Sequence, residues 1–243
     1  MRNIKFIIEY DGTNYVGWQV QPNGPSVQQT LEEGLRRLLQ ENVQLTGAGR
    51  TDSGVHARGQ VANCRVGSEL SPDSLRRGLN ALIPNDIVVL AAEEVPDSFH
   101  ARNSARERFY RYQLALVETA LERTLSWYVG GYTLDLPVMI ACAAQIVGEH
   151  DFTSFSRLDA GRDNFLCAVQ RAEWRREGSN LIFEISANRF LHGMVRTLVG
   201  TMVEIGRGHR PFQEFEDIIK AKDRRVAGMA APAKGLFLEK IVY

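Results

Sequence analysis

One short stretch of the chain concentrates residue types that could act on a ligand. Residues 47–60, GAGRTDSGVHARGQ, hold four glycines, two arginines, one histidine and a single carboxylate, Asp52. Glycine permits positive φ angles and close backbone approach, and reactive groups often lie on loops of a rigid scaffold. The pattern indicates a loop that holds one acid, although a hairpin connection with a solvated aspartate also fits it.

The segments beside this loop are predicted to be strands. Residues 43–46 and 60–66 alternate β-branched with polar side chains, which is the pattern of a half-buried strand. Further strands are expected at 4–10 and 87–90. The loop should therefore connect two strands of one sheet.

Two helices are expected between these strands. Ser26 and Gln29 form a capping box in front of an apolar stripe, and Ser71 followed by Pro72 is typical of a second helix start. The first half should thus follow the order β-α-β-β-α-β.

The second half mixes strands and helices in a similar way. Residues 108–114 alternate as a strand, and residues 168–186 read as a hairpin of two strands. A helix over 190–205 is apolar on nearly all sides, so the charge of Arg196 in its middle needs a partner. Other elements are expected at 134–147, near Pro211 and at 234–243.

These patterns predict an α+β chain of two comparable halves, residues 1–104 and 105–243. The three cysteines have no CxxC spacing, which suggests neither a zinc site nor a disulfide framework. No apolar run reaches membrane-spanning length, so we expect a cytoplasmic protein without a membrane partner.

The charges are balanced overall but unevenly distributed. The chain has 29 Lys and Arg against 29 Asp and Glu, for a formal net charge of +0. Arginines interleaved with aromatic residues suit phosphates and unstacked bases, whereas a solvated strand face would show the same pattern. The two clusters are Arg102, Arg106, Arg108 and Arg111 with Phe109, Tyr110 and Tyr112, and Arg171, Arg175 and Arg176 with Trp174.

Several separated motifs resemble those of the bacterial tRNA pseudouridine synthase A family, in the same order and over nearly the whole chain. They are YDGT at 10–13 with GWQ at 17–19, GRTD at 49–52 with GVHA at 54–57, YRY at 110–112, GEHDF at 148–152 with SF at 154–155, FL at 190–191 with MVR at 194–196, and AP at 231–232 with GL at 235–236. The chain departs from the family at Asn103, where an aromatic residue is usual, and its neutral net charge is low for an RNA enzyme.

The resemblance implies a fold and a reaction. The fold would be two similar ferredoxin-like or RRM-like α+β halves joined through a central, mostly antiparallel sheet, with the active-site cleft between them. The family isomerises uridine to pseudouridine in tRNA without a cofactor or a metal, at positions 38–40 in the anticodon stem-loop. It also implies a homodimer.

The resemblance further assigns roles to three residues. Asp52 would be the catalytic carboxylate, which must stay ionised to stabilise or trap the charge that develops on the sugar. Whether it attacks the sugar or assists elimination stays open. Arg196 would supply the compensating charge. Tyr110 would contact the target base and is a candidate for removing the C5 proton.

Three more residues are expected to contact the substrate. Arg58 would occupy the stack vacated by a flipped uridine or hold a phosphate. Arg50 is expected to bind the substrate as well. His56 would do similar work, or it would close the loop with a hydrogen bond.

Two functions of other classes also fit some of these features. A tRNA-binding or folding module would use the loop only to grip phosphates, so that Asp52 would be dispensable. A metal-dependent hydrolase would use Asp52 and His56, but none of the five histidines lies in a HExxH-like pair. The isomerase is therefore the leading hypothesis.

Overall fold

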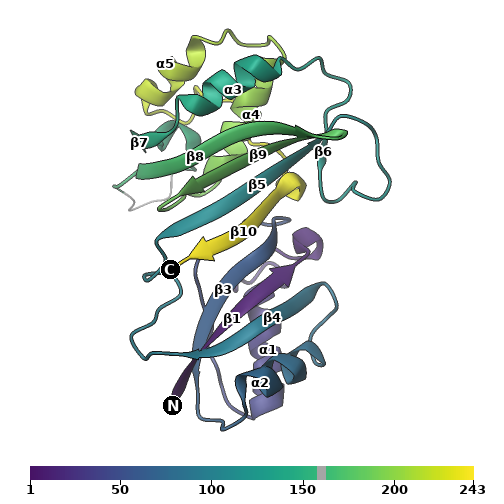
Figure 1. Cartoon of the computed structure of the whole chain (residues 1–243), viewed down its shortest axis with the longest axis vertical. Coiled ribbons are helices and arrows are strands. Elements are labelled where there is room, and N and C mark those ends of the chain that lie inside the picture. The colour runs from purple at the N-terminus through teal and green to yellow at the C-terminus, as the bar shows by residue number, and fades with distance from the viewer. Residues whose placement is uncertain (158–162) are drawn as a thin grey trace. The chain divides into compact units, whose positions relative to one another are not determined.

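The computed structural model describes residues 1–157 and 163–243 (Figure 1). The chain forms two compact units. Unit 1 comprises Met1–Arg106 and Phe237–Tyr243, and unit 2 comprises Glu107–Leu236. Each unit combines helices with strands that pair mostly in antiparallel fashion, which confirms the predicted α+β class.

The sheet of unit 1 has β1 at its centre. Its strands are β1 (Arg2–Tyr10), β2 (Thr46–Gly47), β3 (His56–Val66), β4 (Ile87–Val95) and β10 (Leu236–Val242). β1 lies between β4 and β3, while β2 and β10 pair with the other edge of β3. Together with its helices, unit 1 follows the predicted succession β-α-β-β-α-β.

β2 is shorter than the strand expected over 43–46. The backbone of Leu45 is bonded to helix side chains instead of to a strand. Its N–H donates to the Glu32 carboxylate at 2.8 Å, and its carbonyl accepts from the Gln28 amide at 3.1 Å. These bonds satisfy the backbone groups that a ladder would otherwise pair.

The last strand belongs to a different part of the fold than we expected. Residues 234–243 fall in the predicted second half, but Phe237–Tyr243 lie in unit 1. There β10 pairs in parallel with β3, and the Tyr243 hydroxyl donates to the carbonyl of Ala101 at 2.9 Å. Alternation alone predicts a strand without predicting its partner, so this part of the boundary is corrected.

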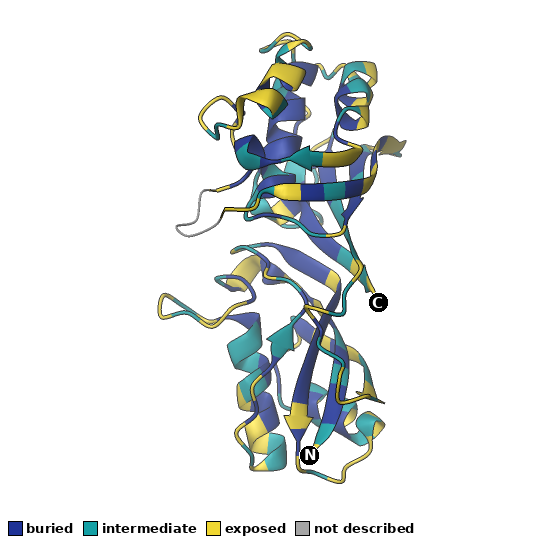
Figure 2. Ribbon diagram, turned by 90° about the vertical axis from the view of Figure 1, so that its left-hand side faces the viewer, coloured by how far each residue is buried: buried dark blue, intermediate teal, exposed yellow. Residues whose placement is uncertain are grey.

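Two helices pack in unit 1, α1 (Val27–Leu39) and α2 (Pro72–Asn80). As predicted, Ser26 and Ser71 cap them, since each side chain accepts a backbone N–H three residues later. A Cβ atom on Gly34 would lie 2.7 Å from Leu79 Cδ1, so the small residue permits close contact between the helices. Figure 2 shows the resulting buried face beside exposed helix surfaces.

The sheet of unit 2 runs in the order β5-β9-β8-β7, with β6 paired to β5. Its elements are β5 (Glu107–Ala115), β6 (Trp127–Tyr128), α3 (Leu136–Ala144), β7 (Gly148–Asp151), β8 (Leu166–Glu177), β9 (Asn180–Ala187), α4 (Met194–Gly206) and α5 (Glu214–Ala221). The predicted hairpin is confirmed as β8 and β9. Short 3₁₀ turns occur at Gly12–Asn14, Thr153–Phe155 and Ala233–Gly235.

Both longer helices of unit 2 differ from their predicted bounds. α4 begins at Met194 rather than at residue 190, because Gly193 adopts a left-handed conformation with φ 71°. α3 starts later than expected because the Asp135 side chain caps it by accepting the N–H of Val138 at 3.0 Å. Arg196 therefore lies in the first turn of α4 and not in the middle of a helix.

The cysteines lie in the interior of the fold. Cys64, Cys142 and Cys167 are buried free thiols, and burial raises the pKa of both Cys64 and Cys142 to about 12. Across residues 1–157 and 163–243, no helix has the length and apolar character needed to cross a bilayer.

The core of unit 1 gives a first test of the fold. Leu31 of α1 is wholly buried, so Leu31→Ala should lower the free energy of unfolding by about 2–5 kcal/mol. Leu121 is 90% exposed, so the matched variant Leu121→Ala should change it by less than about 0.5 kcal/mol. Urea denaturation followed by circular dichroism measures both. Equal effects of the two variants would contradict the packing described.

Candidate active site

Asp52 lies in the loop between β2 and β3. The residue before it is anchored twice: the carbonyl of Thr51 accepts the N–H of Trp18 at 3.1 Å, and its hydroxyl bonds the Tyr10 hydroxyl at 2.8 Å. After it, the N–H of Val55 donates to the carbonyl of Asp52 at 3.1 Å and closes a turn. The half-buried carboxylate is thus carried on a backbone fixed on both sides.

The segment 12–18 forms the support for this loop. The N–H of Gly54 donates to the carbonyl of Tyr15 at 3.3 Å. Gly17 has φ 104°, and a side chain there would collide with the carbonyl of Thr51. Gly12 in the same way leaves room for the carbonyl of Val55. These contacts explain why the motif at 17–19 accompanies the loop. This structural role of the motif was not evident from the sequence.

The loop in the structure is shorter than the predicted stretch 47–60, because β3 already begins at His56. The His56 side chain is 1% exposed and its ring stacks on Phe237, with centroids 4.8 Å apart. Its Nδ1 lies 3.0 Å from the N–H of Gly12 and 3.1 Å from the Asp11 carboxylate. Either contact holds the imidazole ring inside unit 1. A hydrogen bond of His56 was the alternative to a substrate contact in the sequence-based prediction. A substrate contact of His56 stays a prediction.

Asp11 directly precedes the supporting segment 12–18 and caps its 3₁₀ turn. Burial acts to raise the pKa of this carboxyl, but hydrogen bonds from Thr13 and the nearby His56 outweigh it, so the pKa is lowered. The charged form of Asp11 is therefore favoured beside the loop.

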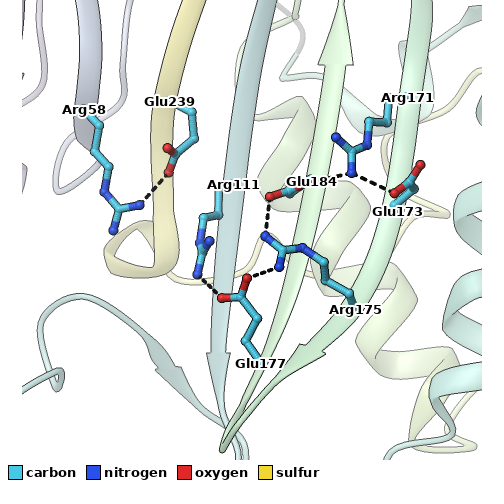
Figure 3. Close-up of polar contacts among 8 residues, drawn as sticks. All are labelled: Arg58, Arg111, Arg171, Glu173, Arg175, Glu177, Glu184 and Glu239. Carbon is cyan, nitrogen blue, oxygen red and sulfur yellow. Dashed lines mark hydrogen bonds and ion pairs between the residues drawn. The ribbon is translucent and has the colours of Figure 1, made fainter.

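Arg58 and Arg50 both reach the surface of unit 1. Arg58 projects from β3 with its side chain 47% exposed, and its guanidinium lies 4.9 Å from the centre of the Phe237 ring. Its Nη1 is 3.1 Å from the Glu239 carboxylate (Figure 3). Arg50 is exposed at the start of the Asp52 loop. The position of each is compatible with the predicted substrate contact, which stays a prediction.

Tyr110 and Arg196 are the predicted site residues of unit 2. Tyr110 lies on β5 with its ring edge against Phe190 at 4.9 Å between centroids. Arg196 is half-buried, and its Nε donates to the carbonyl of Ala231 at 2.8 Å. Nearby, burial raises the pKa of Tyr112 well above its usual value, while the positive charge of Arg196 opposes that rise. The role of Ala231 was missed, although the motif at 231–232 marked its position.

The arginine cluster around Trp174 is not a stacking surface for bases. Trp174 is 5% exposed and packs against Phe183 and Met202 in the core. Arg171 and Arg175 alternate with Trp174 along β8 and so lie on the opposite face of the sheet, where glutamates pair with them (Figure 3). The pairs join Arg111 to Glu177, Arg171 to Glu173 and Glu184, and Arg175 to Glu177 and Glu184. The alternative of a solvated strand face therefore describes Arg171, Arg175 and Arg176, which are exposed, and the ion pairs are an addition that the sequence did not indicate.

The chemistry available in the described residues is that of a carboxylate, a tyrosine and an arginine. No group of three His, Cys, Asp or Glu side chains in the described ranges could hold a metal ion. The backbone bonds around Asp52 hold its carboxylate in a defined place, and a fixed carboxylate can stabilise a developing positive charge.

Comparison with known proteins agrees with this chemistry. Residues 6–103 and 142–243 match the family model described as tRNA pseudouridine synthase. A protein named tRNA pseudouridine synthase A from Thermoanaerobacter sp. (strain X514) is 40% identical over 245 residues, covering 100% of both chains. One of the same name from Chlorobium luteolum (strain DSM 273 / BCRC 81028 / 2530) is 46% identical over 244 residues, covering 100% of this chain and 96% of that one.

These matches place the chain among the isomerases that act on tRNA. It belongs to the tRNA pseudouridine synthase family, which confirms the resemblance seen in its motifs. The binding module and the metal-dependent hydrolase are set aside as its principal activity.

The hydrogen bond beneath the loop gives a test by pH. Burial raises the pKa of Tyr10 to about 12, against about 10 in an unfolded chain, so folding favours the neutral hydroxyl. This contribution is complete below pH 10 and is lost as the pH rises towards 12. The stability advantage of the wild type over Tyr10→Phe should therefore shrink by about 1 kcal/mol between pH 9 and 11. Urea unfolding at each pH measures it, and a constant difference would contradict the buried neutral tyrosine.

Proposed function

We propose that this chain converts uridine to pseudouridine at positions 38–40 of tRNA, in the anticodon stem-loop, with Asp52 as its catalytic carboxylate. The observation that carries the proposal is the fixed backbone around Asp52, which holds a half-buried carboxylate between the bonded residues Thr51 and Val55. The relatives named tRNA pseudouridine synthase A support it. The chemistry needs neither a cofactor nor a metal.

The reaction breaks one bond and forms another within the same nucleotide. The C1′–N1 bond of uridine breaks, its electron pair goes to the base, and positive charge develops on the sugar. An ionised Asp52 stabilises that charge or traps the sugar covalently. The ribose C1′ then bonds to C5 of the base, the C5 proton leaves, and N1 gains a proton. The base is never released, so no second substrate is required.

Arg196 and Tyr110 complete the proposed machinery. Arg196 compensates the charge of Asp52 and favours its ionised form. Tyr110, held by its contact with Phe190, packs against the target base and is a candidate for receiving the C5 proton. The finer fold implied by the resemblance, two similar ferredoxin-like halves, is part of this proposal, as is a homodimer.

A uridine inside a paired stem must leave the stack before it reacts. Flipping costs a few kcal/mol, and a side chain that fills the vacated space offsets that cost. Arg58 has a suitable form for this work, because its guanidinium already lies over the Phe237 ring and reaches solvent. Arg50 and His56 are the other proposed substrate contacts.

The carboxylate is tested by removing its charge. Asp52→Asn keeps the size of the side chain but cannot stabilise a cationic sugar, so kcat should fall by at least about 10³-fold. The exposed helix residue Asp73 gives a matched control, since Asp73→Asn should retain wild-type kcat. Tritium release from C5-labelled uridine in unmodified tRNA measures both. Full activity of Asp52→Asn would contradict the proposal.

The exposed arginines offer a second test, on binding. Arg58→Ala should weaken tRNA binding several-fold and lower the slope of log affinity against log salt by about 1, because one phosphate contact is lost. Arg175 is already paired with Glu177 and Glu184, so Arg175→Ala should leave both quantities unchanged. Filter binding at several salt concentrations compares them. If Arg175→Ala has the larger effect, the assignment of Arg58 is wrong.

A further inference from the structure

A short segment after α5 is fastened along α4 by its backbone. We call residues 227–232 the strap. The N–H of Gly228 donates to the Thr201 hydroxyl at 3.0 Å, and the N–H of Met229 donates to the Glu204 carboxylate at 3.0 Å. The N–H of Ala231 donates to the carbonyl of Arg196 at 2.9 Å. The strap therefore follows one face of the helix for more than two turns.

The helix residues in contact with the strap are suited to hold it tightly. A Cβ atom on Gly200 would collide with the carbonyl of Met229, so only glycine allows this approach. The Thr201 hydroxyl donates to the carbonyl of Thr197 at 2.8 Å while it accepts from the strap. Glu204 is itself fixed by Arg210, whose Nε donates to it at 2.8 Å.

The downstream end of the strap is also fixed. The hydroxyl of the buried Tyr112 donates to the carbonyl of Pro232 at 2.7 Å. The Met229 side chain is 65% exposed, so its burial does not hold the strap in place. Backbone hydrogen bonds on both sides of Ala231 define where its carbonyl points.

That carbonyl accepts from Nε of Arg196 at 2.8 Å. A guanidinium is planar, so a bond at Nε sets both the plane and the direction of the two terminal nitrogens. Any carboxylate that meets Arg196 then does so through those nitrogens in an orientation chosen before the substrate binds. Such preorganisation limits the side-chain entropy lost during the reaction.

We propose that the strap and Gly200 form a positioning device for Arg196, in which the carbonyl of Ala231 aims the guanidinium for the isomerisation. This inference rests on the proposed role of Arg196 in that reaction. If the strap only completed the packing around α4, changes in it would affect stability and leave the chemical step intact.

The first measurement compares two glycines of the same helix. Gly200→Ala displaces the strap and should lower kcat by about 10–100-fold while KM for tRNA changes less than about 3-fold. The control is Gly206→Ala, whose Cβ atom would lie 2.8 Å from Met139 Sδ and away from the strap. Gly206→Ala should cost less stability than Gly200→Ala, because its Cβ atom meets a flexible methionine side chain instead of a backbone carbonyl, and it should keep kcat within about 3-fold of wild type.

The second measurement asks whether the effect passes through Arg196. Lysine keeps the positive charge but has no planar fork for a carbonyl to aim. In the background of Arg196→Lys, adding Gly200→Ala should therefore change kcat by less than about 2-fold. The proposal would be overturned if the two substitutions lowered kcat by independent factors that multiply in the double variant. Wild-type kcat in a folded Gly200→Ala protein would also overturn it.

A third variant tests the proposal if Gly200→Ala does not fold. Thr201→Val removes the hydroxyl that accepts from Gly228 without adding bulk, and kcat should fall about 3–30-fold by the same route. Wild-type kcat in Thr201→Val would then overturn the proposal. If Arg196→Lys alone has wild-type activity, the role of Arg196 in the proposed function is wrong. If Arg196→Lys is impaired but Gly200→Ala lowers kcat by the same factor with or without it, only the proposed role of the strap is wrong.

Discussion

The candidate site depends on backbone hydrogen bonds between two separate segments, 12–18 and 51–55. A loop that holds a carboxylate has few apolar side chains with which to fix itself, so its peptide groups must do so. The bonds from Trp18 to Thr51 and from Gly54 to Tyr15 meet this need, and glycines at 12 and 17 keep the two chains close enough to make them. A reactive acid can thus be held still outside any helix or strand.

Charge pairing decides which arginines are available for a polyanion. On the sheet of unit 2, Arg171 and Arg175 of β8 pair with Glu184 of the neighbouring strand β9, and Arg111 of β5 pairs with Glu177 at the end of β8. Arg58 pairs with one glutamate, Glu239, whereas Arg171 and Arg175 each pair with two. The neutral net charge therefore does not describe every surface, because the charges are paired more completely on the sheet of unit 2 than at Arg58.

Local sequence signals predicted most helices and strands, but they could not predict contacts between residues far apart in the chain. Ser26 and Ser71 were found because a cap is a contact within one turn of helix. The shortening of β2 was not found, because it depends on Glu32 reaching Leu45, and the place of β10 depends on a strand about 180 residues earlier in the chain. For the site, the motifs predicted Asp52 and Arg196, whose catalytic roles stay predictions. The motif at 231–232 marked the position of Ala231 but not its role, because that role belongs to the backbone carbonyl and not to a side chain.

The parallel pairing of β10 with β3 has a consequence for the order of events during synthesis. Phe237, against which the His56 ring stacks, is translated only after the whole of unit 2. A growing chain that has completed its first hundred residues still presents one edge of β3 without this neighbour. Unit 1 therefore cannot complete its sheet until β10 has been synthesised, and until then the exposed edge of β3 is capable of pairing with other chains.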